Sequence, residues 1–252
     1  MADPDRLQTV VQQFDKMSDV MPRVPWFADA DRARELLAFA GLAAGENVLE
    51  VGCGPGFVLA EVGSAGRLVG VDVSLRMLAS ARERAPNVLA VRAAVERLPF
   101  SDGAYDVAYC RSVLHHVLEP ASMIHEMARV VKRGGRVVVN DSVSSEDPRQ
   151  SENHNRMERL RDPSHGRMVS PSELLELFRR ASLDVTQLRA HRYRRDLGEF
   201  LDIGGPGPAE RKEVLDLFRA WTSRDESGLF VRRERGRIVF DHTQWTVLGI
   251  RR

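Results

Sequence analysis

Val48-Leu49-Glu50-Val51-Gly52-Cys53-Gly54-Pro55-Gly56 is an apolar run that breaks into three alternate glycines. The run predicts a buried strand, the glycines predict a tight turn, and the following Phe57-Val58-Leu59-Ala60-Glu61 predicts the start of a helix. Glycine tolerates positive φ, and because it lacks Cβ a ligand can lie against its backbone. The N–H groups of the new helix would point into the same crevice. The stretch therefore predicts a turn that holds a small molecule.

A second apolar run, Arg67 to Asp72, predicts the next strand of a βαβ unit and ends in a carboxylate twenty residues after Gly52. An acid at this place can accept both hydroxyls of a ribose. Nicotinamide and flavin sites prefer G-x-G-x-x-G, whereas the third glycine here comes one residue early, at Gly56, and Phe57 stands where such sites need glycine. The spacing favours a nucleoside without a pyrophosphate. A nicotinamide oxidoreductase is disfavoured further because the chain has no Tyr-x-x-x-Lys pair.

Length and composition favour one catalytic domain, because 252 residues with 43% hydrophobic residues can bury one sizeable core. A formal charge of +1 gives no steering toward polyphosphate, so we expect no nucleic-acid partner. The two cysteines, Cys53 and Cys110, form neither a disulfide framework nor a metal pattern, which fits a reducing cytoplasm. Residues 1–5 lack an apolar signal segment, and no run of 18 apolar residues occurs, so we expect a soluble, cytoplasmic protein with no membrane partner.

Strand and helix patterns alternate along the chain, which predicts a mainly parallel sheet. Seven strands are expected, at 48–51, 67–72, 87–91, 105–110, 136–140, 183–188 and 244–250. Helices are expected over 7–17 and 33–40, after Ser74, from Ile124 to the Gly134-Gly135 pair, after the capping box at Ser170, and around Val214 to Trp221. The polar stretch from Ser142 to Ser151 contains Asp147-Pro148 and predicts a loop at the carboxyl edge of the sheet, where ligand-contacting loops lie.

Further segments carry a resemblance to a known family. They are Glu96-Arg97-Leu98-Pro99-Phe100 with Asp102 and Tyr105-Asp106-Val107, then Ser112-Val113-Leu114-His115-His116-Val117, then Arg129-Val130-Val131-Lys132-Arg133-Gly134-Gly135-Arg136. With the glycine turn, their order and spacing resemble the class I S-adenosylmethionine-dependent methyltransferases, in particular the group similar to ubiquinone and menaquinone biosynthesis methyltransferases. The resemblance covers roughly residues 27 to 190, with Arg133 standing where proline is usual.

This resemblance implies an α/β fold with a Rossmann-like doubly wound, mainly parallel seven-stranded sheet. It also implies an N-terminal helical arm that folds over the cofactor and a small inserted cap over the acceptor pocket. We expect the arm or lid over residues 1–30, the S-adenosylmethionine-binding core over 31–190, the cap insertion over 191–240 and the last strand of the core sheet over 241–252.

The implied cofactor is S-adenosyl-L-methionine, held by the glycine turn and by Asp72 at the ribose. Glu50 is expected at the methionine end, unless it caps a helix, and Met77 along the adenine, unless it is plain core. The remaining expected cofactor-binding residues are Gly52, Cys53, Gly54, Gly56, Val73, Ala94, Val95, Glu96, Arg111 and Ser112. Before Glu96 the family usually has Asp-Ala, but this chain has Ala94-Val95. The hydrogen bond from that aspartate to the adenine amino group is therefore missing, a loss of ~1 kcal/mol, while the backbone of Val95 can still meet the ring.

Two adjacent histidines are the candidates for acid–base chemistry. His115 and His116 follow the fourth predicted strand, and His116 is the predicted catalytic base; the alternative is that backbone partners satisfy both rings in a packed loop. Metal-assisted quinone O-methyltransferases carry glutamates where Ser112 and His115 stand, so we expect no metal. Asp162-Pro163-Ser164-His165 either lines the acceptor pocket through His165 or forms an aspartate turn.

Two basic runs either are solvated strand faces or contact an anionic group on the acceptor. They consist of Arg189, Arg192, Arg194 and Arg195, and of Arg232, Arg233, Arg235 and Arg237. The sequence as a whole predicts methyl transfer to a small organic acceptor, by O-, N- or C-methylation, as in the tailoring of natural products. The alternative is an S-adenosylmethionine-binding protein or a non-methylating enzyme of the same fold. An RNA target and a homodimer stay open.

Overall fold

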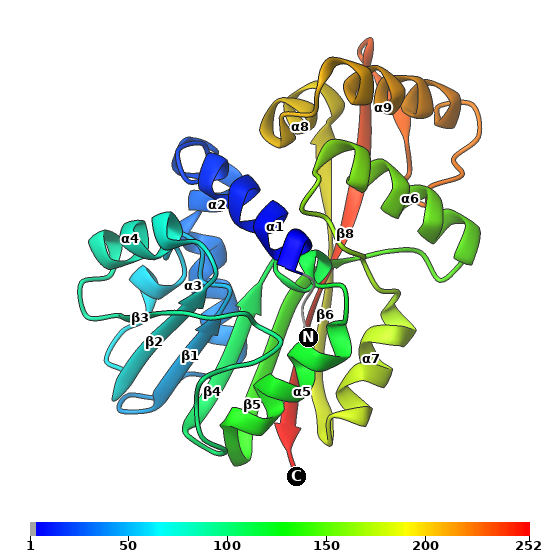
Figure 1. Ribbon diagram of the computed structural model, residues 1–252. Helices are drawn as coiled ribbons and strands as arrows, with labels where there is room; N and C mark the ends of the chain where they lie inside the picture. Colours follow the sequence, from blue (N-terminus) through cyan, green and yellow to red (C-terminus); the bar gives the residue numbers. More distant parts are fainter. Residues whose placement is uncertain (1–3) are drawn as a thin grey trace.

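One eight-stranded sheet organises residues 4–252, the part of the chain that the computed structural model describes (Figure 1). The strand order is β3-β2-β1-β4-β5-β8-β6, with β7 paired to β8. The first five strands in this order are parallel, while β8 is antiparallel to β5, β6 and β7. The strands are β1 (Asn47–Val51), β2 (Arg67–Asp72), β3 (Leu89–Arg92), β4 (Tyr105–Arg111), β5 (Val131–Val143), β6 (Leu183–Asp196), β7 (Arg232–Glu234) and β8 (Arg237–Arg251). The predicted fold class is confirmed, and β7 is an addition to the seven predicted strands.

Residues 1–3, on which part of the expectation about export rests, lie outside the described residues.

Helices cover both faces of the sheet. On one face, α3 (Ala30–Ala40) and α4 (Leu75–Arg84) pack with Val48 of β1. On the other face, α5 (Pro120–Val130) and α7 (Pro171–Arg180) pack with Leu49. Neighbouring residues of β1 thus belong to different clusters, as the alternation of side chains along a strand requires. Burial on both faces explains why the run at 48–51 is continuously apolar except for Glu50.

The crossover that follows the glycine turn differs from the prediction. Instead of a helix beginning at Phe57, the structure has a single 3₁₀ turn, η2 (Leu59–Glu61). Only residues 57–66 join the turn to β2, and Gly63 and Gly66 stand among them. A parallel crossover with a full helix needs a dozen or more residues. The predicted helix is therefore wrong, and no helix N-terminus faces the crevice from this segment.

The end of α5 also differs from the prediction. The helix ends at Val130, four residues before the glycine pair, because Val131 already pairs with Tyr105 in the sheet. The glycines lie within the first part of β5, where a Cβ on Gly135 would come within 2.7 Å of the carbonyl oxygen of Asp106. Gly134-Gly135 thus allows close strand packing, and the prediction that the pair ends the helix is wrong.

A helix replaces the last four residues of the loop predicted from Ser142 to Ser151, and β5 includes its first two. Asp147 accepts hydrogen bonds from the N–H groups of Arg149 (2.8 Å) and Gln150 (3.0 Å), and Pro148 opens α6 (Pro148–Arg161). Aspartate at the N-cap followed by proline at the first helical position is a helix start. The prediction of a loop as far as Ser151 is therefore wrong beyond Asp147.

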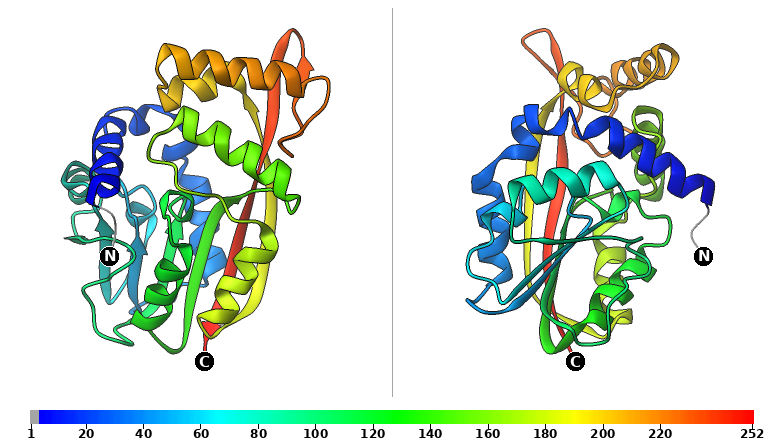
Figure 2. Two further views of the ribbon diagram at one scale, coloured as in Figure 1. Left: turned by 45° about the vertical axis from the view of Figure 1, so that its right-hand side comes forward. Right: turned by 60° about the vertical axis from the view of Figure 1, so that its left-hand side comes forward.

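A cap is built on two strands that continue past the rest of the sheet. β6 pairs with β8 from Leu183 to Asp196, with one register shift between Val185 and Gln187, and the two strands carry α8 (Leu197–Gly204) and α9 (Pro208–Trp221) between them, as two views of the ribbon show (Figure 2). The small core of this cap includes Phe200, Phe218 and Phe240, and Met157 of α6 packs in it. Helix α6 therefore joins α8 and α9 in the cap. α8 and the extra length of β6 and β8 have no counterpart in the sequence prediction.

The N-terminal arm lies across the carboxyl ends of the strands. It consists of α1 (Pro4–Met17) and two short turns, η1 (Met21–Arg23) and α2 (Pro25–Ala28). The hydroxyl of Ser74, at the start of α4, donates to Asp15 Oδ1 at 2.5 Å, and Arg76 pairs with Asp19 at 2.9 Å. At the other side Arg6 donates to the carbonyl of Pro163 at 2.5 Å. The arm thus bridges α4 and the loop after α6. Among residues 4–252, no helix is both long and apolar enough to cross a bilayer.

Candidate active site

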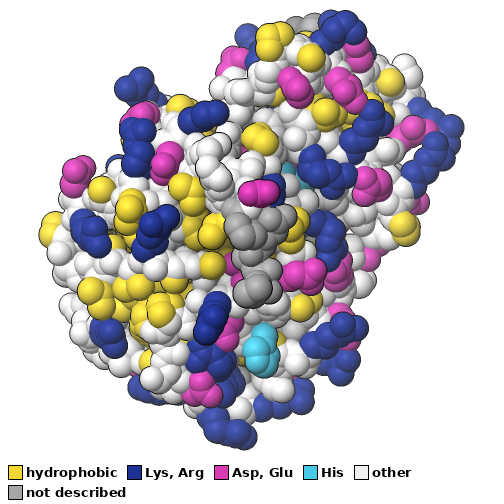
Figure 3. All heavy atoms as spheres, viewed as in Figure 1, with side chains coloured by type: hydrophobic (Ala, Val, Ile, Leu, Met, Phe, Trp, Pro, Cys, Tyr) yellow, Lys and Arg dark blue, Asp and Glu magenta, His cyan; other side chains and the backbone are white. Residues whose placement is uncertain are grey.

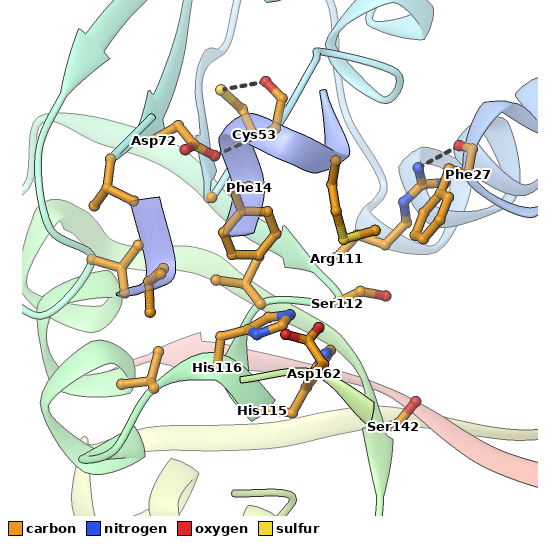
Figure 4. A pocket seen from close by; sticks show the side chains of 18 of the residues that line it. Phe14, Phe27, Cys53, Asp72, Arg111, Ser112, His115, His116, Ser142 and Asp162 are labelled. Atoms are coloured by element: carbon orange, nitrogen blue, oxygen red, sulfur yellow. Dashed lines mark hydrogen bonds between the residues drawn. The ribbon is translucent and has the colours of Figure 1, made fainter. Parts of the chain in front are cut away.

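A cavity of about 890 Å³ opens at the carboxyl ends of β1 and β4, where the strand order reverses (Figure 4). Such a reversal point is where open α/β sheets bind ligands. The arm forms the roof of the cavity through Leu7, Val10, Phe14 and Met17. The glycine turn and the ends of the strands form one half, and the cap forms the other. The volume is near the upper end of the roughly 300–1,000 Å³ of small-molecule sites, which leaves room for two ligands side by side.

The three glycines of the turn serve different purposes. All have positive φ, at 69° for Gly52, 50° for Gly54 and 81° for Gly56. A Cβ on Gly52 would lie 2.5 Å from Val113 Cγ2, and one on Gly56 would lie 2.9 Å from the Cα of Ala81. A Cβ on Gly54 would meet nothing within 4 Å, and Gly54 lines the cavity. Gly52 and Gly56 therefore fit the turn against its neighbours, whereas Gly54 leaves its backbone open to a ligand.

Asp72 is fixed at the floor of the cavity by two backbone donors. Its Oδ2 accepts from the N–H of Gly54 and its Oδ1 from the N–H of Ser74, both at 2.9 Å. Burial raises the pKa of this carboxyl although the two N–H groups favour the charged form. Its side chain lines the cavity next to the open backbone of Gly54. The arrangement suits two hydroxyl donors of a ribose, which would add favourable partners to a desolvated carboxylate.

Glu50 is the second buried acid of the cavity. It is 2% exposed, and the hydroxyl of Tyr109 donates to its Oε2 at 3.1 Å. Burial raises the pKa of Glu50 to about 8, against the opposing charge of Arg111. Arg111 itself donates to the carbonyl of Phe27 at 2.8 Å and so ties β4 to the arm. With a pKa of about 8, Glu50 of the free protein is mostly protonated near neutral pH, and a cationic group beside it would favour release of that proton to solvent.

The other predicted cofactor residues divide into two groups. The structure brings to the cavity wall Cys53, Val73, Ala94, Val95, Glu96, Arg111 and Ser112. Gly56 and Met77 are not in the wall; Met77 is fully buried, and its N–H donates to the hydroxyl of Ser74, the N-cap of α4. Met77 therefore occupies a core position beneath the wall. The site roles of all these residues stay predictions.

His115 and Asp141 form a pair that the sequence did not indicate. Nδ1 of His115 lies 2.5 Å from Oδ1 of Asp141, at the carboxyl end of β5. Burial disfavours the imidazolium, but the adjacent carboxylate outweighs it, so the pKa of His115 lies above its ordinary value. Because Nδ1 faces Asp141, Nε2 is left as the acceptor nitrogen, and His115 lines the cavity. An imidazole oriented by a carboxylate is the arrangement of a general base.

His116, the predicted base, also lines the cavity but has different partners. Its Nδ1 lies 3.1 Å from both the carbonyl oxygen and the hydroxyl of Ser164, and its ring meets that of Phe14 edge-on at 4.8 Å. Burial, together with the charge of His115, lowers the pKa of His116 to about 4. A ring of such low basicity stays neutral and accepts a proton weakly. Figure 4 shows it directly below Phe14 of the arm.

The loop after α6 resolves an alternative left open by the sequence. Asp162 Oδ1 accepts from the N–H of Ser164 at 2.8 Å and from its hydroxyl at 2.6 Å, which makes the aspartate turn. His165 is buried, and its Nε2 contacts Asn155 Oδ1 at 2.9 Å. Asp162 lines the cavity, whereas His165 does not. The aspartate turn is therefore the correct interpretation.

The cap half of the wall is the part that the sequence left undefined. Its residues come from β5, α6, the loop after α6, α8 and the upper parts of β6 and β8: Ser142, Glu158, Arg161, Met168, Arg195, Phe200, Ile203, His242 and Gln244. Arg195 belongs to a basic run for which the sequence allows either a solvated strand face or contact with the acceptor; its side chain turns inward and stacks 4.0 Å from the ring centre of Trp26. Burial and the charge of Arg161 lower the pKa of Arg195 to about 10, so it stays cationic. The alternation of β6 could have revealed the inward position only if its full length had been known.

Comparison with known proteins agrees with this arrangement. A family model described as a methyltransferase domain matches residues 49–139. The uncharacterized methyltransferase YcgJ of Bacillus subtilis is 30% identical over 208 residues, which span 80% of this chain and 82% of YcgJ. The crystal structure of YcgJ superposes with a TM-score of 0.82 and 26% identity, covering 87% of this chain and 97% of YcgJ. A demethylmenaquinone methyltransferase of Paenarthrobacter aurescens is 30% identical over 138 residues, 54% of each chain.

Proposed function

Because this chain belongs to the S-adenosylmethionine-dependent methyltransferases of class I, we propose that it methylates a small organic acceptor bound between the arm and the cap. The nucleophilic atom of this acceptor loses a proton during the reaction. The proposal is carried by one observation, the His115–Asp141 pair at the junction of the two halves of the cavity. A base held at this place is of use only to an acceptor that must be deprotonated.

The cofactor half fits S-adenosylmethionine. Gly54 offers open backbone, Asp72 suits the ribose hydroxyls, and Glu50 suits the cationic amino group of the methionine end. When bound, S-adenosylmethionine supplies a methyl group on a sulfonium and leaves as S-adenosylhomocysteine. The absence of a carboxylate before Val95 leaves the adenine to backbone and apolar contacts.

The residues of the chain then have three tasks. The arm and cap exclude water and hold the acceptor in line with the methyl group, which can supply about 7–11 kcal/mol in favourable cases. Nε2 of His115 would accept the proton that the nucleophilic atom of the acceptor loses when that atom takes the methyl group from the sulfonium. Asp141 keeps the imidazole in the required tautomer and stabilises the imidazolium that forms.

The arm and the cap together support an acceptor with a flat apolar body and an acidic group such as a phenol. Trp26 and Phe27 of the arm and Phe200 of the cap supply apolar surface, and Arg195 places a positive charge beside it. That charge stabilises a developing oxyanion. A small molecule also agrees with the outer surface, where basic and acidic side chains are interspersed in the view of Figure 3. The cytoplasmic location, the absence of nucleic-acid and membrane partners, and the homodimer stay predictions.

The experiment is an acceptor screen with S-adenosylmethionine labelled in the methyl group. Phenols and other compounds with an acidic hydroxyl group, amines and carbon nucleophiles are incubated with the enzyme, and labelled product and S-adenosylhomocysteine are quantified. We expect labelled product with the compounds that carry an acidic hydroxyl group. Cofactor binding without product from any class would contradict the proposal and favour a non-methylating enzyme of the same fold.

Variants then test the base. His115→Gln and Asp141→Asn should lower kcat by about 10²–10⁴-fold with little change in cofactor affinity. His116→Gln is the matched comparison, because it alters the neighbouring imidazole of the same wall. A greater loss of turnover in His116→Gln than in His115→Gln would return the role of base to His116.

A further inference from the structure

Three buried side chains converge on one point of the cap wall. His154 and Glu158 stand four residues apart on α6, and His242 comes from β8. They are 2%, 1% and 5% exposed. One ligand atom from each, Nε2 of the two histidines and a carboxylate oxygen of Glu158, lies within 4.8 Å of the other two. Residues four apart on a helix share a face, so α6 presents both of its donors to the same strand.

These donor atoms lack the partners that buried polar atoms require. Among the described residues, Nε2 of His154, Oε1 of Glu158 and Nε2 of His242 make no hydrogen bond of acceptable geometry. Oε1 lies 3.7 Å from Nε2 of His154 and 3.1 Å from Nε2 of His242. A buried polar atom without a partner costs free energy, and three that face one another indicate a missing common partner.

We propose that His154, Glu158 and His242 bind a divalent transition-metal ion. Metal–ligand distances of about 2.0–2.2 Å place neighbouring ligand atoms roughly 3–3.5 Å apart. The two distances from Glu158 to the histidines, 3.1 and 3.7 Å, are close to this range, and the two imidazole nitrogens, which lie within 4.8 Å of each other, would move together on binding. Two imidazoles and a single carboxylate favour Zn²⁺, Fe²⁺ or Co²⁺ over Mg²⁺ and Ca²⁺, which prefer oxygen ligands.

The charges around the cluster set limits on this site. Nε of Arg161 donates to Oε2 of Glu158 at 2.9 Å, which orients the carboxylate and leaves Oε1 for the metal. Arg161 and Arg195 are cationic and line the same wall, so their charges disfavour the binding of a metal cation beside them. We therefore expect weaker binding than at a closed structural zinc site, which has four protein ligands.

Three protein ligands leave coordination positions free. Glu158 and His242 line the cavity, so these positions face the place of the acceptor. The metal would therefore contact an oxygen of the acceptor and help to deprotonate it. This role rests on the proposed function, whereas metal binding itself does not.

The test is metal binding by untagged protein after treatment with a chelator, without cofactor or acceptor. Titration calorimetry with Zn²⁺ should show one site per chain, and Co²⁺ should give a visible absorption band without a thiolate charge-transfer band. His154→Gln and His242→Gln should each weaken binding at least about tenfold. Mg²⁺ should not compete at equal concentration.

His125→Gln is the matched control, because His125 is an exposed histidine of α5. It should leave binding unchanged, and circular dichroism checks that all variants are folded. The proposal is overturned if Zn²⁺ and Co²⁺ do not bind, if both cluster variants bind the metal as tightly as the wild type, or if the cobalt spectrum shows thiolate ligation by Cys53 or Cys110. Because no methyl transfer is measured, failure of the proposed function leaves this result intact.

Discussion

Nδ1 of His115 lies 2.5 Å from Oδ1 of Asp141, and this contact joins the turn after β4 to the carboxyl end of β5. The second oxygen, Oδ2, accepts from the N–H groups of Val113 (2.9 Å) and Leu114 (2.6 Å). One carboxylate therefore holds both the backbone of the turn and the imidazole that the turn presents. The shape of the turn and the reactivity of the histidine depend on the same side chain.

The stability of the protein should reflect this pair in a defined range of pH. The pKa of His115 is raised above 6.5, so its contribution is fully present below pH 6.5 and is lost as the pH rises through the higher folded value. The pKa of Asp141 is lowered below 3.8, so its contribution is present above that pH. His115→Gln should therefore destabilise the protein by roughly 1 kcal/mol more at pH 6 than at pH 9. Urea unfolding at both values measures the difference.

The control for this experiment is His125→Gln, which changes an exposed histidine. Its unfolding free energy should differ from that of the wild type by the same small amount at both pH values. Equal destabilisation by His115→Gln at pH 6 and pH 9 would contradict a charged pair.

Asp72 should determine cofactor affinity through its two fixed oxygens. Asp72→Ala removes an acceptor for the ribose and also two acceptors for the N–H groups of Gly54 and Ser74. We expect a loss of about 1–3 kcal/mol in the binding of S-adenosylhomocysteine, measured by titration calorimetry. Asp184→Asn, at an exposed position of β6, serves as control. Unchanged affinity in Asp72→Ala would refute the ribose assignment.

Cofactor binding should release a proton from Glu50. With a pKa of about 8 the carboxyl is protonated at pH 7, and an ammonium group beside it would lower that pKa. Calorimetry in phosphate and in Tris, whose ionisation enthalpies differ, should give close to one proton released at pH 7 and far less at pH 9. Glu50→Gln should abolish the buffer dependence. A buffer-independent enthalpy in the wild type would place the amino group elsewhere.

The arm should control release of the product. Arg76→Ala removes its pairing with Asp19, whereas Arg6→Ala removes the contact of a cavity-lining side chain with the carbonyl of Pro163. We expect dissociation of S-adenosylhomocysteine to become roughly three- to tenfold faster, because altered contacts act mainly on off-rates. Stopped-flow fluorescence can follow it through Trp26. Arg219→Ala on α9 is the control, and unchanged rates in both arm variants would show that the arm does not gate release.

The cofactor half was predictable because its signals are local. The glycine turn, Asp72 and the segment ending in His116 each follow a strand directly, and the fold brings the ends of those strands together. Three expectations differ there: Gly56 and Met77 lie outside the cavity wall, and the crossover after Gly56 has too few residues for the helix that its apolar pattern predicts.

The cap half could not be predicted because it depends on contacts between distant segments. The inward direction of Arg195 follows from the length of β6, which extends eight residues beyond the predicted Leu188. His154 and Glu158 lie in a part of α6 that the sequence assigned to no element, and His242, which completes their cluster, comes from β8. His115 and Asp141 are 26 residues apart. In each case the polar side chain carries no local sign of its partner.

β6 and β8 pair without a break in direction from the sheet into the cap, from Leu183 opposite Arg251 to Asp196 opposite Val239. The chain therefore enters and leaves the cap through residues that are paired across the two strands, such as Arg189 and Thr246. A recombination event with both crossovers at this pair would exchange the segment between them as one contiguous piece, and α6 and the N-terminal arm, which contacts Tyr193 and Arg195 through Trp26, would have to be matched to it. The pairing of β6 with β8 thus marks a place where the part of the chain that contacts the acceptor can be exchanged in evolution. The part that contacts the methyl donor would stay unchanged.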